Sequence, residues 1–354
     1  MRAPTGLHLD YLSPAGYQSA RRADVLGVVT FDGSVVAPRP ADGVAGIPYA
    51  HVSTPVLPAA GHVYEVWRCG EPAESGRHDA VRFRRTADVL FGCITINEAE
   101  TARLAPGSGR QSPLQEATAQ AYRQICAALD AENYPHLLRM WNYLPEINRD
   151  EHGSERYRQF NRARRRTWRA CGRALEGNVP AASVLGSPLL SPVVVYFLAG
   201  LTAPTFVENP RQVSAYHYPR DYGAHRPSFS RATLLRQTRG LALFISGTAS
   251  IVGHETVHEG EILAQTEETL RNLRAVIAAA NERTTARFDL SALDCVVYVR
   301  HAADASVVRQ VMQESLGPAA HTLSHAVFLE ADICRQDLLV EIEAHAVARG
   351  ALRG

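Results

Sequence analysis

Glu341 has the setting in this sequence that most directly suggests chemistry. It lies in the segment LLVEIEA (338–344), whose alternation of apolar and polar residues predicts a half-buried strand. A carboxyl group in such a strand loses hydration, which raises its pKa, so it can stay protonated and donate a proton near pH 7. Glu343 shares the same face of this strand, and the sequence leaves open whether one of the two carboxyls is solvated. Cys334 lies in the turn before the strand, and nothing in the local sequence distinguishes a reactive thiol from a core cysteine.

A segment rich in aromatic and basic residues supplies candidate ligands for an anion. Residues 216–226 contain three tyrosines, two histidines and two arginines within eleven positions. Arginine together with phenol hydroxyls suits a carboxylate carried on an apolar ring. The alternative is a solvated loop that uses tyrosine and proline for rigidity. The candidates in this segment are Tyr216, Tyr218, Arg220 and Arg226, and Arg300, at the end of the strand-like run VVYVR, is either a further anion ligand or an exposed strand-end residue.

Gly247 interrupts the strand-like run FISGTASI (244–251). A glycine inside a strand indicates either a bulge or a close approach by a ligand or another backbone, and the sequence does not decide between them.

The zincin motif HExxH is matched in residue types by His254-Glu255-Thr256-Val257-His258. That chemistry requires both histidines on one face of a continuous helix. Here Gly253 and Gly260 flank the motif, and Thr256 and Val257 are both β-branched. We therefore expect a loop, and neither a metal nor another cofactor.

The composition narrows the classes of partner. The formal net charge is +1, so no overall field favours nucleic acid or a membrane. All 37 basic residues are arginine, which excludes Schiff-base and phosphate-loop lysines, so an anionic ligand must be bound by arginine. The six cysteines form no CxxC pair, and no apolar run reaches the roughly 18–20 residues that span a bilayer. The N-terminus also lacks a basic-then-apolar leader pattern, so we expect a cytoplasmic protein with reduced thiols.

The elements that must position these residues occur twice along the chain. In each copy an apolar strand precedes an amphipathic helix, a second strand and a second helical segment. Duplicated units tend to place their site where the copies meet. The expected parts are an irregular N-terminal segment packed on the first unit (1–79), the first unit (80–205), a linker carrying site residues (206–235) and the second unit with the catalytic residues (236–354). Within the N-terminal segment, residues 25–31 and 62–67 are short strand-like runs.

Several motifs resemble those of one family. The string GxASxxG…AQTxxxLxNLxAVxxAAN, followed by VEIEA, resembles the RidA/YjgF fold, and the whole chain beyond about residue 80 resembles the chorismatases, in which two such units follow each other. The distinctive segments are ERYRQFNRAR (155–164), SAYHYPRDYG (214–223), FISGTASIVGHETVHEG (244–260) and the terminus from Cys334 to Glu341. The resemblance implies an α+β fold of two tandem units in a pseudo-trimeric arrangement. Each unit would be a mixed β-sheet backed by two helices, and the protein a monomer or small homo-oligomer.

The resemblance also implies an activity. The substrate would be chorismate, with Glu341 as the acid that protonates the enolpyruvyl methylene. Tyr157 and Arg220 match substrate contacts, to which we add Arg300, Tyr216, Tyr218 and Arg226. Gly247 and Cys334 stand where hydrolytic members carry alanine, which favours 3-hydroxybenzoate and pyruvate as products, with 4-hydroxybenzoate as a possible companion.

Two alternatives stay open. One is a hydrolytic chorismatase that forms a dihydrodiol acid and pyruvate, and the other is a non-catalytic RidA-like metabolite binder. RidA-type deamination is disfavoured, because the arginine that those enzymes carry about fifteen residues before the terminal glutamate is absent; His325 and Ala326 occupy that region.

Overall fold

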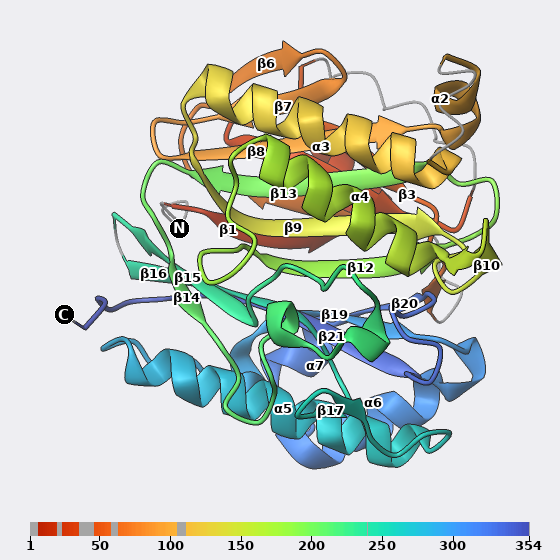
Figure 1. Cartoon of the computed structure of the whole chain (residues 1–354). Coiled ribbons are helices and arrows are strands. Elements are labelled where there is room, and N and C mark those ends of the chain that lie inside the picture. The colour runs from red at the N-terminus through yellow and green to blue at the C-terminus, as the bar shows by residue number, and fades with distance from the viewer. Residues whose placement is uncertain are drawn as a thin grey trace.

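The computed structural model describes residues 6–19, 23–34, 46–57, 63–104, 111–238 and 240–353. Within these ranges the chain forms three larger β-sheets and two short hairpins (Figure 1). None of the helices in these ranges combines the length and the apolar character needed to cross a membrane.

The first unit is a six-stranded sheet covered by two long helices. The strand order is β12-β9-β13-β8-β7-β6. Figure 1 shows α3 and α4 together on one face of this sheet. The elements are β6 (Glu74–His78), β7 (Val81–Arg85), β8 (Val89–Ile96), α2 (Glu98–Leu104), α3 (Pro113–Glu132), β9 (His136–Pro145), the hairpin of β10 (Asp150–Glu151) and β11 (Ser154–Glu155), α4 (Arg156–Ala170), β12 (Ala181–Ser187) and β13 (Val193–Gly200).

The second unit is a seven-stranded sheet of order β14-β15-β16-β21-β19-β20-β4, with α5 and α6 on its outer face (Figure 1). Its last strand, β4 (Val56–Leu57), comes from the N-terminal part. The other elements are β14 (Thr205–Val207), the 3-10 turns η1 (Ala215–His217) and η2 (Arg220–Tyr222), β15 (Ala232–Gln237), β16 (Gly240–Ala249), the hairpin of β17 (Ile251–Val252) and β18 (Glu255–Thr256), α5 (Ile262–Glu282), η3 (Leu290–Ala292), β19 (Asp294–Val299), η4 (Ala302–Asp304), α6 (Ala305–Leu316), α7 (His321–His325), β20 (Val327–Glu330) and β21 (Val340–Ala348).

The two units share one pattern of strand pairing. In the first, β13 pairs antiparallel with β8 and β9, and β12 pairs parallel with β9. In the second, β21 pairs antiparallel with β16 and β19, and β20 pairs parallel with β19. The order along the chain is also shared, since β8-α3-β9-α4-β12-β13 corresponds to β16-α5-β19-α6-β20-β21. The predicted α+β fold with two tandem units is confirmed.

The N-terminal part forms a third sheet with an abbreviated version of this pattern. Its order is β1-β5-β2-β3, in which β5 pairs antiparallel with β1 and β2, and β3 pairs parallel with β2. This part is more regular than the irregular segment expected from the sequence. The two strand-like runs expected there correspond to β2 and β5, whereas β1 and β3, of five and four residues, carry little periodic signal. The elements are β1 (His8–Leu12), α1 (Pro14–Ser19), β2 (Val25–Phe31), β3 (Tyr49–Val52) and β5 (Val63–Arg68).

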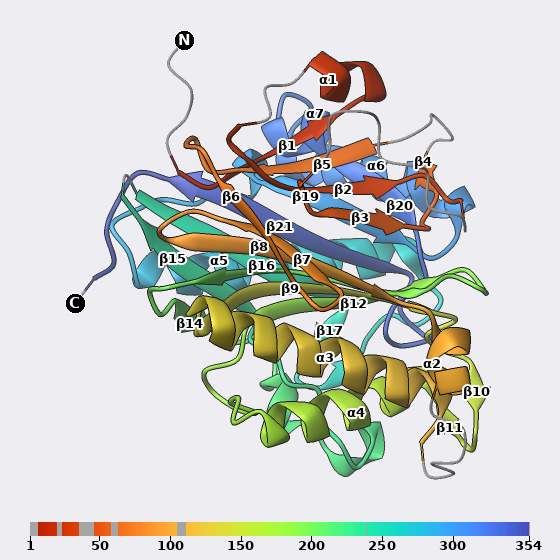
Figure 2. The same ribbon diagram turned by 90° about the horizontal axis from the view of Figure 1, so that it is seen from above.

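The three sheets meet in one aromatic core. Trp141 of the first unit stacks on Tyr196 at 4.6 Å between ring centroids, and Trp67 of the N-terminal sheet lies 5.5 Å from Trp141 and 6.2 Å from Phe244 of the second unit. Figure 2 shows the N-terminal strands on the side of the molecule opposite to α3 and α4. Burial of one ring of this size stabilises the fold by about 1.5–3 kcal/mol, so this shared core fixes the two units relative to each other.

Helix boundaries follow from their capping residues. Ser112 and Gln115 form a capping box at the start of α3, with Pro113 in the first turn, and Asn133 ends the helix in the left-handed conformation. The second long helix, α5, ends at Glu282, and Arg283 follows it as the C-cap residue. The apolar stripe of α3 packs against the sheet of the first unit, and that of α5 packs against the sheet of the second. These helices do not cover the ends of the strands, so a site can form there between the units.

Candidate active site

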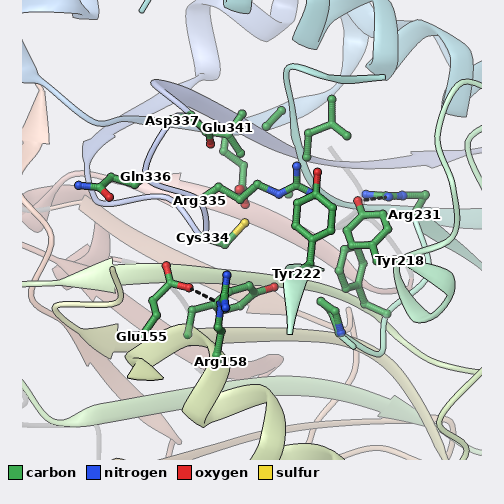
Figure 3. Close-up of a pocket in the computed structure, with 17 residues that line it drawn as sticks. Glu155, Arg158, Tyr218, Tyr222, Arg231, Cys334, Arg335, Gln336, Asp337 and Glu341 are labelled. Carbon is green, nitrogen blue, oxygen red and sulfur yellow. Dashed lines mark hydrogen bonds and ion pairs between the residues drawn. The ribbon is translucent and has the colours of Figure 1, made fainter. Parts of the chain in front are cut away.

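A pocket of about 370 Å³ lies between the two units (Figure 3). The first unit contributes residues from the β10–β11 hairpin and the start of α4, and the second contributes β16 and the approach to β21. The segment between the units supplies the aromatic wall. The lining residues that carry polar or reactive groups are Glu155, Tyr157, Arg158, Tyr218, Tyr222, Arg231, Cys334, Arg335, Gln336, Asp337 and Glu341.

Glu341 is a buried carboxyl group in the lining of this pocket. It lies on β21 between Ala249 of β16 and Tyr298 of β19, and only 4% of it is exposed. Burial, and then the charge of Glu343, raises the pKa of Glu341 to about 8, while Arg139, Arg231 and Arg300 act in the opposite direction. The carboxyl is therefore protonated at neutral pH and can donate a proton into the pocket.

Gly247 lies on a bulge of β16 directly beside the acid. The pairing of β16 with β21 shifts register between Ile245 and Thr248, and the Gly247 N–H donates to Ser183 Oγ of the first unit at 3.0 Å. A β-carbon at Gly247 would stand 1.8 Å from Glu341 Oε1. Of the two interpretations left open by the sequence, the bulge is present, and the group that approaches closely is a side chain of the protein itself.

Cys334 and Tyr157 line the pocket from opposite units. Cys334 lies on the turn before β21, and burial, followed by the charge of Glu341, raises the pKa of its thiol to about 12. Tyr157 lies in the first turn of α4, and burial raises its pKa well above the usual range. Both groups are therefore neutral and can act as hydrogen-bond donors at pH 7.

Two arginines of the pocket hold unused donors. Arg231 is 5% exposed and donates through Nη2 to Val213 O at 2.9 Å and to the Tyr218 hydroxyl at 2.7 Å. Arg335 donates through Nη1 to His254 O at 2.9 Å, and its guanidinium lies 4.2 Å from the Tyr222 ring centroid. Arg231 Nε and Arg335 Nη2 are buried without a hydrogen-bond partner among the described residues. Buried N–H groups of this kind suit an anionic ligand.

These two arginines were missed by sequence reasoning. Arg335 directly follows Cys334, and Arg231 ends the linker just before β15. Their proximity to recognised motifs was the available signal. Arg158, the third arginine of the pocket, is exposed and lies 3.5 Å from Glu155 in an ion pair.

The predicted linker residues divide into two groups. Tyr218 lines the pocket, together with Tyr222 at 5.5 Å between ring centroids. Arg220 is exposed on η2 and is not among the lining residues. Tyr216 is buried in the core of the first unit, and Arg226 donates through Nε to Tyr218 O at 2.6 Å. Arg226 therefore supports the aromatic wall from behind.

Arg300 also lies outside the pocket lining. Its guanidinium donates to Leu338 O at 2.8 Å, to Arg335 O at 2.9 Å and to Asp332 Oδ1 at 2.5 Å. These bonds fasten the turn that carries Cys334 and Arg335. The structure thus places Arg300 as a brace of the site and not as one of its walls.

The zincin-like string lies in the β17–β18 hairpin and the turn that follows it. Its two histidines are not on a helix, in agreement with the loop expected from the sequence. In the described part of the chain, no cluster of three or more histidine, cysteine, aspartate or glutamate side chains has the geometry to hold a metal ion.

Comparison with known proteins places the chain in a family. A family model described as chorismatase FkbO/Hyg5-like, N-terminal, matches residues 65–199. A 3-hydroxybenzoate synthase from Streptomyces hygroscopicus is 37% identical over 298 residues, which are 81% of this chain and 82% of that protein. A chorismatase from Streptomyces rapamycinicus is 39% identical over 289 residues, or 79% of this chain and 80% of that protein. The crystal structure of a chorismatase matches with a TM-score of 0.83 at 31% identity and covers 97% of this chain and 98% of that chain. The chain therefore belongs to the chorismatase family.

Proposed function

We propose that this protein is an enzyme that converts chorismate to 3-hydroxybenzoate and pyruvate. The observation that carries the proposal is the combination, in one pocket, of the neutral carboxyl of Glu341 with arginine N–H groups that no described residue accepts from. Chorismate offers the complementary chemistry, because it carries two carboxylates and an enol ether whose methylene accepts a proton.

In the proposed first step, Glu341 protonates the enolpyruvyl methylene. The resulting oxocarbenium ion weakens the bond between the ring and the ether oxygen, and pyruvate leaves with that oxygen. As the bond from C3 to the ether oxygen breaks, the C4 hydroxyl oxygen bonds to C3 and gives its proton back to the Glu341 carboxylate. The resulting epoxide opens at C4, its oxygen takes up a proton, and loss of the C3 proton restores aromaticity with the hydroxyl on C3. Hydroxybenzoate and pyruvate together contain the atoms of chorismate, so the net reaction consumes neither water nor an oxidant.

We assign substrate binding to the arginines on the pocket walls. Arg231 and Arg335 would meet the carboxylates, and their hydrogen bonds to the Tyr218 hydroxyl and to His254 O hold them in place before the substrate arrives. Tyr157, Tyr218 and Tyr222 would pack against the ring and donate from their hydroxyls. The family resemblance suggests Arg220 as a further substrate contact, but its exposed position on the surface does not support that role.

The product assignment rests on Gly247 and Cys334. Both positions line the pocket next to Glu341, and the Streptomyces hygroscopicus relative is named a 3-hydroxybenzoate synthase. The hydrolytic reaction is the second candidate, because the same protonation step followed by attack of water would give a dihydrodiol acid and pyruvate. Formation of some 4-hydroxybenzoate is compatible with both the 3-hydroxybenzoate reaction and the hydrolytic reaction.

Incubation of the purified protein with chorismate tests the proposal. Pyruvate is measured with a coupled lactate dehydrogenase assay, and ring products are separated by chromatography against 3-hydroxybenzoate, 4-hydroxybenzoate and the dihydrodiol acid. We expect 3-hydroxybenzoate and pyruvate in equal amounts. Binding of chorismate without release of pyruvate would instead identify a non-catalytic metabolite binder.

A further inference from the structure

Behind Glu341 lies a polar network that joins the two units. Arg139 on β9 and Ser183 on β12 belong to the first unit, and Glu343 on β21 belongs to the second. Arg139 Nη2 lies 2.7 Å from Glu343 Oε2 and 2.6 Å from Ser183 Oγ. All three residues are buried, with Arg139 at 2% exposure. A charged pair this far from water is stable only when its remaining hydrogen-bonding groups are satisfied.

The hydroxyl of Ser183 uses its full bonding capacity. It accepts from Arg139 Nη2 and, at 3.0 Å, from the N–H of Gly247, and it donates to Glu343 Oε2 at 2.6 Å. The second oxygen of Glu343 accepts from Trp141 Nε1 at 2.8 Å. This hydroxyl therefore ties the bulge of β16 to the ion pair of Arg139 and Glu343.

The network also reaches Glu341 in space. The ideal β-carbon position at Gly247 is 1.8 Å from Glu341 Oε1 and 3.1 Å from Ser183 Oγ, so these two oxygens lie within about 5 Å of each other. Glu341 and Glu343 project from the same face of β21, two residues apart. The charge of Glu343 acts on Glu341 to keep its proton, and Arg139 opposes this effect.

We propose that Arg139, Ser183 and Glu343 are positioning residues for Glu341. Glu343 supplies the negative charge that holds Glu341 in its acid form, and Ser183 fixes the glycine bulge against which the Glu341 carboxyl rests. None of the three lines the pocket, so each acts through Glu341 or Gly247 and not through the substrate. The role of these three residues in catalysis rests on the proposed function, whereas their effect on the protonation of Glu341 does not.

Glu343 has a further carboxyl neighbour in the N-terminal sheet. Glu65 on β5 faces Glu343, and burial, followed by the charge of Glu343, raises the pKa of Glu65 to about 8. Glu65 is therefore neutral at pH 7, which leaves one carboxylate, Glu343, for the single charge of Arg139. Two further groups of charged or titratable residues interact with the pair. Glu341 interacts with Arg231, Arg300 and Cys334. Glu343 acts on Tyr11, Tyr143, Tyr196, Tyr298 and Cys295.

The sign of the expected effect follows from these charges. The variant Glu343→Gln removes a negative neighbour and leaves Arg139 positive, so Glu341 loses its proton at a lower pH. In a pH profile of kcat/KM on chorismate, we expect the decline on the alkaline side to move from near pH 8 to at least one pH unit lower. Glu65→Gln is the matched control, because it replaces a buried carboxyl of the same core that is not among the groups acting on Glu341, and it should leave the profile in place.

Ser183→Ala tests geometry separately from charge. We expect roughly a tenfold lower kcat with the alkaline limb within about 0.3 pH units of the wild type, because the charges persist while the bulge loses its tether. Thr233→Val is its control, since Thr233 Oγ1 donates to Leu138 O at 2.9 Å and also joins the units, but outside the pocket. This variant should retain wild-type kinetics.

A direct titration keeps the test independent of turnover. Carbon-13 NMR of glutamate-labelled protein, with Glu341→Gln to assign the signal, follows the proton of Glu341 without substrate. A lowered pKa in Glu343→Gln supports the proposal even if chorismate proves not to be the substrate, and Glu343→Asp should restore most of the shift. The same titration midpoint in the wild type, Glu65→Gln and Glu343→Gln would overturn it.

Discussion

An oxygen of the Glu341 carboxyl occupies the space that a β-carbon at position 247 would need. The distance from that ideal position to Glu341 Oε1 is 1.8 Å, far below any normal contact. The absence of a side chain on the β16 bulge is thus what allows the acid to lie against the strand. Because the carboxyl is the far end of a flexible side chain, a methyl group at position 247 would redirect it without disrupting the fold.

The first prediction concerns the acid itself. Glu341→Gln preserves the shape of the side chain but removes its transferable proton, so turnover of chorismate should fall by roughly 10²–10⁴-fold. Pyruvate release in a coupled assay measures the loss, and thermal unfolding verifies that the fold is retained. A variant that keeps more than a tenth of the wild-type rate would remove Glu341 from the role of general acid.

The second prediction separates the pocket arginines from the surface arginine. Arg231→Gln and Arg335→Gln should each raise KM and lower kcat/KM roughly 10- to 100-fold, because hydrogen bonds to charged groups contribute about 1.5–3 kcal/mol. Arg220→Gln is the control and should change kcat/KM less than about twofold, since Arg220 is exposed outside the pocket. The reverse ranking in steady-state kinetics would restore Arg220 to the site suggested by family resemblance.

The third prediction concerns the thiol. Burial raises the pKa of Cys334 to about 12, so at pH 7–8 almost no thiolate is present to react with an alkylating agent. Iodoacetamide should therefore modify Cys334 more slowly at pH 7.5 than it modifies a free thiol such as glutathione. Peptide mass spectrometry follows the modification, and rapid alkylation of Cys334 would show that its environment favours the anion.

Most strand and helix positions could be predicted from the sequence, because periodicity reports burial directly. The amphipathic helix expected in the first unit is α3, which buries Leu114, Ile125 and Leu129. The strand expected around Glu341 is β21, but it is not half-buried: both of its faces are buried from Val340 to Ala346, because the first unit packs on the face that carries Glu341 and Glu343. The third sheet could be predicted only in part: β2 and β5 fall on the two strand-like runs expected in this segment, whereas the short strands β1 and β3 gain their order from pairing with β5 and β2.

Of the candidate site residues, five line the pocket: Tyr157 at the start of α4, Tyr218 in the linker, and three residues close to strands. Glu341, Gly247 and Cys334 lie on or next to β16 and β21, whose geometry follows from alternation, and all three line the pocket. The direction of a linker side chain depends on tertiary contacts instead. Arg220 and Arg231 lie in the same arginine-rich stretch, yet only Arg231 turns inward, where it donates to the Tyr218 hydroxyl.

The last prediction concerns the product branch. In Cys334→Ala combined with Gly247→Ala, the Glu341 carboxyl is redirected and the neutral thiol beside the ring is lost, while the acid itself remains. Pyruvate release should therefore stay measurable, and the ring product should shift from 3-hydroxybenzoate towards the dihydrodiol acid. Chromatography of the reaction mixture measures the ratio, and the two single variants show which position contributes more. An unchanged yield of 3-hydroxybenzoate per pyruvate in the double variant would show that the branch is set elsewhere, and the aromatic wall formed by Tyr218 and Tyr222 would be the next place to test.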